Sequence, residues 1–156
     1  MTSGDKFLRW VVLIGVFAIP AVIPFLVTSS LFFPFITGKG FTFRIITEIV
    51  FVLWFVLTLR DKNYRPKKSW IVYAIGAFLG VMLLADAFAE NPLKAFWSNY
   101  ERMEGYVTLV HLALYFTVLG SIVNTEKLWR YFFRLNILAS FVMSCYGLLQ
   151  LAGKIT

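Results

Sequence analysis

Five long apolar runs constrain this chain more than any other feature of its sequence. They cover about residues 10–31, 41–59, 70–88, 106–123 and 131–151. A helix needs roughly 20 apolar residues to cross the hydrocarbon core of a bilayer, and each run has or approaches that length. Because the bilayer core offers no water to free backbone groups, we expect every run to be helical. The sequence therefore predicts an all-α bundle that forms one transmembrane domain.

The composition excludes an ordinary soluble domain of this size. Of the 156 residues, 60% are hydrophobic and only 15% are charged. A soluble chain of this length could not bury so much apolar surface. The formal net charge of +7 does not indicate a nucleic-acid partner, because the basic residues lie in short loops between apolar runs. The single cysteine, Cys145, lies in an apolar run and is expected to pack as a small hydrophobe.

The basic residues predict how the helices are oriented. The segment RDKNYRPKKS, residues 60–69, contains five Lys and Arg residues and one Asp. Other basic residues lie next to the first and fifth runs: Lys6, Arg9, Lys127, Arg130 and Arg134. Cytoplasmic loops of membrane proteins are enriched in Lys and Arg, so we expect a cytoplasmic N-terminus and an outer C-terminus. Outer loops are then expected at about residues 37–41 and 89–105.

The first run begins like a signal peptide but is expected to remain as a membrane span. Its apolar stretch exceeds the ~7–15 residues of a signal-peptide core, and no small-residue cleavage site follows it. Pro20 and Pro24 predict a kink, because proline cannot donate a helical hydrogen bond. In the third run, Gly76 and Gly80 form a G-x-x-x-G motif, which predicts close packing by another helix of the chain.

Ionisable residues inside the runs are the first candidates for function. Glu48 lies in the middle of the second run, and Arg44 precedes it by one helical turn, within ion-pair reach. Inserting such a group into a bilayer is costly, which makes it a candidate functional residue. The alternative is a structural pair in which Arg44 extends toward the outer surface. Asp86 and Glu90 have the same spacing near the outer end of the third run, where a simple interfacial position is the alternative.

His111 lies early in the fourth run and is the only histidine of the chain. At helical spacing it shares a face with Glu104, Thr108 and Tyr115. It is expected to be either a hydrogen-bonded packing residue or a ligand or base. No spacing of His, Cys and carboxylate residues resembles a metal site, and no phosphate-binding loop or nucleophile motif is present. We therefore expect no metal and no cofactor.

The segment AFWSNYERMEGYVT, residues 95–108, concentrates charge and aromatic rings between two apolar runs. The rings are typical of an aromatic belt at the membrane surface, but a belt does not need the charges. These charges form either part of a binding site or a set of salt bridges that brace the loop. With the candidates above, the predicted substrate-binding residues are Trp97, Asn99, Tyr100, Glu101, Arg102, Glu104, Arg44, Glu48, Asp86 and His111.

Three stretches carry a resemblance to a known family. NPLKAFWSNYERMEGYVTLVHLALYF, residues 91–116, resembles the N-terminal half of bacterial O-antigen ligase and O-antigen polymerase proteins. YGLLQLAGK, residues 146–154, and SSLFFPFITGKGFTFRIITEI, residues 29–49, resemble other parts of the same half. The W-S-N-Y-E-R-M-E-G run is the specific part of this resemblance.

The resemblance implies a multi-pass enzyme of the bacterial plasma membrane. Such enzymes take a glycan from undecaprenyl diphosphate at the outer face and join it to a lipid, protein or glycan acceptor of the cell envelope. Arginine suits the diphosphate, carboxylates and amides suit sugar hydroxyls, and His or Glu could act as a base. On this interpretation the outer ends of the second, third and fourth spans converge on Arg102. Membrane lipids would be the remaining partners.

Members of this family are longer, and their catalytic Arg and His residues lie in an outer loop of a C-terminal half that has no counterpart here. No catalytic residue is therefore assigned, and we expect a fragment, the product of a truncated gene, or a subunit that needs a partner. Two other functions remain open. A small transporter component would align Glu48, His111 and Gln150 along one polar path. A non-catalytic assembly subunit would pair its polar groups internally.

Labelling of single cysteines tests the predicted orientation. In a Cys145→Ser background, Asn91→Cys should react with a membrane-impermeant maleimide in intact cells, because it lies in a predicted outer loop. Ser69→Cys should react only after the membrane is permeabilised, because it follows the basic segment. The opposite pattern of labelling would reverse the orientation.

Overall fold

The structure, a computed structural model, describes residues 3–27, 36–99 and 104–153 of the chain. Within these ranges every regular element is helical, which confirms the all-α prediction. The α-helices are, in order, α1 Ser3–Val22, α2 Thr37–Arg60, α3 Trp70–Ala87, α4 Pro92–Trp97, α5 Tyr106–Ile122 and α6 Glu126–Leu151. Short 3-10 helices, η1 Ile23–Phe25 and η2 Lys62–Tyr64, follow α1 and α2.

The helices match the predicted apolar runs closely, except at three beginnings. α1 begins at Ser3, α2 at Thr37 and α6 at Glu126, so residues before these runs are helical as well. Residues 37–41, which were expected to form an outer loop, are the first turn of α2 instead. The predicted end of the first run, residues 28–31, lies outside the described residues. Of the helices that the structure describes, four are long and apolar enough to cross a membrane: α1 with η1, α2, α3 and α6. The remaining predicted span, the fourth run, is α5, which is apolar and has 17 residues.

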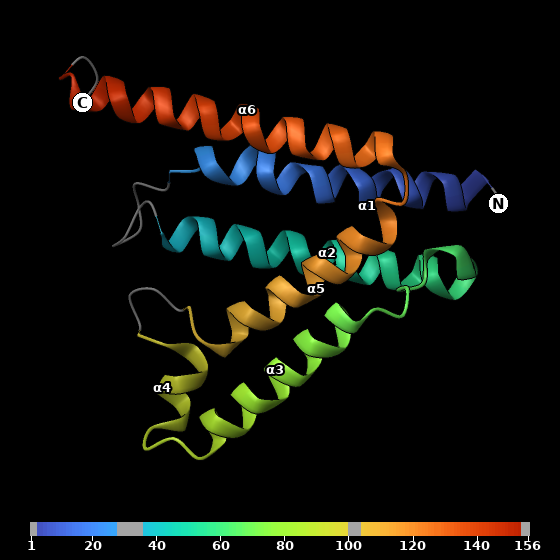
Figure 1. Ribbon diagram of the computed structural model, residues 1–156, viewed down its shortest axis with the longest axis horizontal. Helices are drawn as coiled ribbons and strands as arrows, with labels where there is room; N and C mark the ends of the chain where they lie inside the picture. Colours follow the sequence, from blue (N-terminus) through green and yellow to red (C-terminus); the bar gives the residue numbers. More distant parts are fainter. Residues whose placement is uncertain (1–2, 28–35, 100–103, 154–156) are drawn as a thin grey trace.

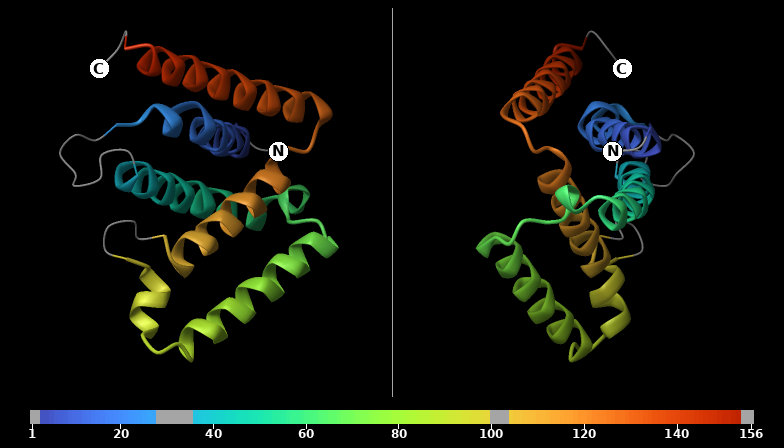
Figure 2. Two further views of the ribbon diagram at one scale, coloured as in Figure 1. Left: turned by 60° about the vertical axis from the view of Figure 1, so that its left-hand side comes forward. Right: turned by 90° about the vertical axis from the view of Figure 1, so that its right-hand side faces the viewer.

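The helices form a bundle in which α5 has a central position. α1 packs against α2 and α6, α2 packs against α5, and α5 packs against α3 and α4. Figures 1 and 2 show α6, α1 and α2 side by side, with α5 crossing obliquely and α3 beyond it. α3 and α4 are therefore attached to the other helices mainly through α5.

Local sequence signals determine where several helices begin and end. The hydroxyl of Ser69 accepts a hydrogen bond from the Ile71 N–H (3.3 Å) and thereby caps α3. The Thr125 hydroxyl caps α6 in the same way, with the Leu128 N–H as donor (3.3 Å). Such caps satisfy backbone donors that have no partner in the first helical turn. α1 continues through Pro20 to Val22, and the 3-10 helix η1, which contains Pro24, follows it, so the kink predicted from the prolines stays a prediction.

The hydrophobic core lies where α1, α2 and α5 meet. Its fully buried apolar side chains are Val12, Val16, Leu57, Val118, Ile122 and Val123. The indole Nε1 of Trp54 donates a hydrogen bond to the Tyr64 carbonyl oxygen (3.1 Å), so η2 is held against α2. Aromatic residues of α6 pack at the edge of this core, and the ring of Phe132 meets that of Phe17 edge-on at 5.6 Å between centroids.

One glycine allows close helix packing, but not at the predicted motif. A Cβ atom at Gly15 would collide with a methyl group of Val50, so glycine at this position lets α1 approach α2. A Cβ atom at Gly76 or Gly80 would have no described atom within 4 Å. The prediction that the G-x-x-x-G of α3 packs against another helix is therefore wrong for the described part of the chain.

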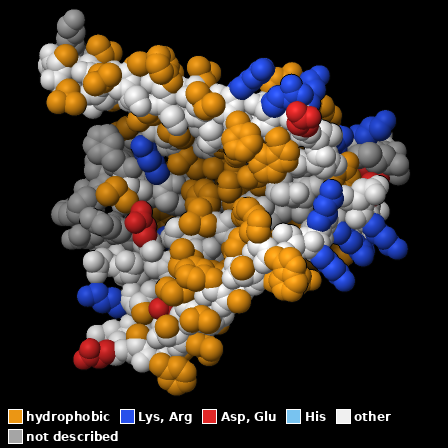
Figure 3. All heavy atoms as spheres, in the orientation of Figure 1, with side chains coloured by type: hydrophobic (Ala, Val, Ile, Leu, Met, Phe, Trp, Pro, Cys, Tyr) orange, Lys and Arg blue, Asp and Glu red, His pale blue; other side chains and the backbone are white. Residues whose placement is uncertain are grey.

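Several helix faces are apolar and exposed. α3 has no buried residue, and in α6 only Ala139 is buried, among the described residues. Figure 3 shows hydrophobic side chains along both helices. On α2, exposed residues recur at alternating intervals of four and three, and we call them the α2 stripe: Phe41, Ile45, Glu48, Val52, Phe55 and Leu59. Apolar faces of this kind are compatible with a membrane protein.

The basic segments gather at one end of the bundle. Figure 3 shows most Lys and Arg side chains at the end where α1 begins, α2 ends and α6 begins. Arg60 Nη1 lies 3.8 Å from Asp5 Oδ1, and the Arg9 guanidinium lies 5.9 Å from the centre of the Tyr64 ring. These contacts join segments that the sequence analysis assigned to the same side of the membrane.

Two leucines of α2 test the position of the core. Leu57 is 0% exposed and Leu59 is 65% exposed. Leu57→Ala should lower the free energy of unfolding by roughly 2–5 kcal/mol, because it removes packing atoms and leaves a cavity. Leu59→Ala, the matched control, should change it by about 0.5 kcal/mol or less. Unfolding of the purified protein from mild detergent by a denaturing detergent measures both, and equal losses would contradict this core.

Candidate functional site

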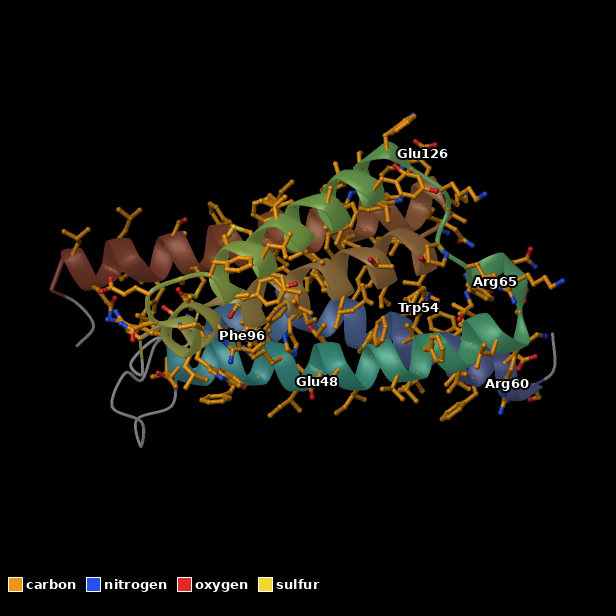
Figure 4. The ribbon with its side chains drawn as sticks, turned by 90° about the horizontal axis from the view of Figure 1, so that it is seen from below. Glu48, Trp54, Arg60, Arg65, Phe96 and Glu126 are labelled. Carbon is orange, nitrogen blue, oxygen red and sulfur yellow. The ribbon has the colours of Figure 1, made fainter. Side chains whose placement is uncertain are left out.

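Two polar links connect α2 to α5 and form the candidate site. The Arg44 Nη2 group donates a hydrogen bond to the Thr108 hydroxyl oxygen (2.7 Å). One turn further along both helices, His111 Nε2 lies 2.9 Å from Glu48 Oε1. Figure 4 shows Glu48 in the middle part of α2, with Arg60 at the far end of the same helix. The site therefore lies within the bundle and away from its basic end.

The helical spacing explains why these four side chains meet. Residues four apart on α2 and three apart on α5 lie on one face of each helix. Arg44 is only 8% exposed and so does not extend into solvent. Among the ion pairs of the described residues, Glu48 pairs with His111 and not with Arg44. The direct Arg44–Glu48 pair considered from the sequence is thus replaced by two bonds between helices.

Both ring nitrogens of His111 face an oxygen atom. Its Nδ1 lies 2.7 Å from the Val107 carbonyl oxygen of its own helix. Its Nε2 lies 2.9 Å from Glu48 Oε1 on α2, and the tautomer of the ring decides which nitrogen donates. Contacts on both sides thus hold the ring between its own helix and α2.

The predicted polar face of α5 is confirmed for three of its four residues. Beyond Thr108 and His111, the Tyr115 hydroxyl donates a hydrogen bond to the Val16 carbonyl oxygen (3.1 Å) and so joins α5 to α1. Glu104 precedes the first residue of α5 and is exposed. The carbonyl acceptors of Val16 and Val107 were not predicted, because every residue has a carbonyl group and the sequence does not indicate which is used.

Glu48 differs from its partners in exposure. Its side chain is 63% exposed, whereas that of His111 is 11% exposed. It belongs to the α2 stripe, so its carboxyl group is bordered by exposed apolar side chains such as Ile45 and Val52. One side of the group faces His111, and the other side faces the outside of the bundle.

The remaining candidates do not join this cluster in the described structure. Trp97 ends α4 and is 47% exposed, and Asn99 is exposed just after it. Asp86 lies in the last turn of α3, and its Oδ2 atom is enclosed without a hydrogen-bond partner among the described residues. The last three candidates, Tyr100, Glu101 and Arg102, lie outside the described residues. The predicted convergence of helix ends on Arg102 therefore stays a prediction.

The short helix α4 was not predicted, although Asn91-Pro92 is a typical helix start. Its aromatic residues contact the beginning of α5, since the rings of Phe96 and Tyr106 lie 5.5 Å apart between centroids. A Cβ atom at Gly105 would collide with the backbone of Phe96, so glycine allows the chain to enter α5 next to α4. Gly105, the last residue of the W-S-N-Y-E-R-M-E-G run, thus allows α4 and α5 to pack closely.

The described residues also form an apolar hollow on the α3 side of α5. A hollow of about 410 Å³ between α3 and α5 is lined by hydrophobic side chains together with Tyr115. No group of three His, Cys, Asp or Glu residues that could hold a metal ion occurs in the described ranges.

Comparison with protein-family models, with curated proteins and with solved structures finds no match for this chain. The functional interpretation therefore depends on the residues, their geometry and the resemblance of residues 91–116.

Two threonines of α5 test the links between the helices. Thr108→Val should lower the free energy of unfolding by about 1 kcal/mol, because it removes the acceptor of a hydrogen bond between helices. Thr117→Val is the matched control, since the Thr117 hydroxyl donates to Ala113 of its own helix (2.8 Å). We expect a smaller loss there, measured by the same detergent titration. An equal loss of unfolding free energy in Thr117→Val and Thr108→Val would show that the bond between α2 and α5 contributes no more than a bond within one helix.

Proposed function

We propose that this chain is the membrane-embedded part of a bacterial glycan ligase or polymerase of the O-antigen ligase type. It would lie in the plasma membrane and span it several times. The observation that supports this proposal is the run W-S-N-Y-E-R-M-E-G at residues 97–105, followed directly by the polar residues of α5. Thr108 and His111 lie in the first two turns of that helix. The specific motif and the polar cluster are thus consecutive in the chain.

The end of the bundle at which α5 begins suits a reaction at the outer membrane face. α5 begins at Tyr106, at the end of the bundle away from the basic segments. With those segments in the cytoplasm, as the charge distribution predicts, the beginning of α5 would lie at the outer surface. Undecaprenyl diphosphate would present its glycan at that surface.

The residue types suit binding of the donor. Arg102 offers a fork of N–H donors to a diphosphate, and arginine binds phosphate oxygens in pairs. Asn99 and Glu104, which precede and follow it in the sequence, are exposed polar residues that can bond sugar hydroxyls. The half-exposed ring of Trp97 offers an apolar face to a sugar ring. These residues would bind and orient the donor, and no catalytic group is assigned.

A non-catalytic assembly subunit is the second candidate. Its support is the internal pairing of Arg44 with Thr108 and of Glu48 with His111, which was the expectation for such a subunit. A transporter component receives less support. Gln150 Nε2 bonds the Tyr146 hydroxyl within α6 (3.4 Å), and α6 packs on α1 rather than on α2 and α5.

Glycan transfer in cells tests the proposed function. The gene for this chain is deleted, and the complete reading frame is restored with either the wild-type sequence, Arg102→Ala or Lys94→Ala. We expect the deletion to accumulate undecaprenyl-linked glycan and to lose the acceptor product. Arg102→Ala should reproduce this defect at matched membrane abundance, because it removes the proposed diphosphate ligand. Lys94→Ala, a control in the same outer segment, should transfer normally.

The outcomes separate the two candidates. A deletion that leaves both the lipid-linked donor and the acceptor product unchanged would exclude a ligase or polymerase. A deletion defect that the Arg102→Ala gene corrects fully would support an assembly subunit and would assign the charged run to bracing of the loop.

A further inference from the structure

A hollow on the first turns of α6 is lined by cationic and aromatic side chains. It has a volume of about 250 Å³, and its lining residues are Lys127, Arg130, Tyr131 and Arg134. Their spacing of three, four and seven residues places them on one side of the helix. Because these four side chains project from the same side of α6, they can contact one ligand together.

The positive charge of this hollow is only partly balanced. Arg130 Nη2 lies 3.3 Å from Glu126 Oε1, and both side chains are exposed. Neither Lys127 nor Arg134 has an ion-pair or hydrogen-bond partner among the residues that the structure describes. Two cations therefore face the hollow without an anion, and a bound anionic group could accept hydrogen bonds from both.

An apolar surface continues directly from the hollow along the same side of α6. Ile137 and Phe141 follow Arg134 at intervals of three and four residues, and they are 69% and 65% exposed. Tyr131 is half-exposed and combines an apolar ring with a hydroxyl group, as aromatic residues at membrane surfaces do. A ligand that matches the whole surface has an anionic head and an apolar tail.

We propose that this hollow binds the phosphate group of an anionic membrane phospholipid, with an acyl chain along Ile137 and Phe141. Lys127 and Arg134 donate charge-assisted hydrogen bonds to the phosphate oxygens. Basic pockets on membrane helices bind anionic headgroups in this way. A zwitterionic lipid gains less, because its own cation is repelled by the same residues. This site is independent of the proposed glycan transfer.

Native mass spectrometry of the full chain in mild detergent tests the proposal. Dioleoyl phosphatidylglycerol is titrated, and its binding is compared with that of dioleoyl phosphatidylcholine and of soluble glycerol 3-phosphate. We expect phosphatidylglycerol to bind more tightly than either. Arg134→Gln should weaken its binding about fivefold, since one cation near an anionic lipid contributes on the order of 1 kcal/mol. Arg134→Lys should retain most of the binding, and the control Lys94→Gln on α4 should not change it.

Three outcomes would overturn the proposal. Equal binding of phosphatidylglycerol and phosphatidylcholine would exclude recognition of the anionic head. Equal binding of glycerol 3-phosphate and phosphatidylglycerol would show a phosphate site that ignores the acyl chain. Equal weakening by Arg134→Gln and Lys94→Gln would place the lipid elsewhere, and circular dichroism of each variant excludes loss of helical structure as the cause.

Discussion

The need to give the polar side chains of two apolar helices a partner determines how α2 and α5 meet. Arg44 and Glu48 on one helix find their partners, Thr108 and His111, on the other. Polar groups without partners in such surroundings are costly, so these bonds fix the rotation and the relative height of the two helices. Because α3 and α4 reach the bundle mainly through α5, their positions depend on the same contact.

The sequence predicted the fold well because length and hydropathy depend only on local composition. The bounds of α3 differ little from its apolar run, and Ser69 marks the start of this helix as an N-cap residue. The polar face of α5 was also predictable, since helical spacing alone places Thr108, His111 and Tyr115 on one side. The bonding partners of these residues lie on α1 and α2, so they depend on how those helices pack against α5.

The parts that could not be predicted are those that depend on packing between helices. A spacing of four residues fits a direct Arg44–Glu48 pair as well as two bonds to another helix, and only the arrangement of α5 decides between them. Gly15 has no neighbouring glycine to mark it, yet it lies at the close approach of α1 and α2. The G-x-x-x-G of α3 has the pattern, but no described atom lies within 4 Å of a Cβ atom placed at either of its glycines.

The closeness of Glu48 and His111 has an electrical consequence. A single charge that crosses a membrane gains or loses about 2.3 kcal/mol per 100 mV of potential. An ion pair carries no net charge, and the two atoms that meet here are only 2.9 Å apart. As an ion pair in a membrane, this contact between α2 and α5 would therefore respond much less to the membrane potential than either charge alone.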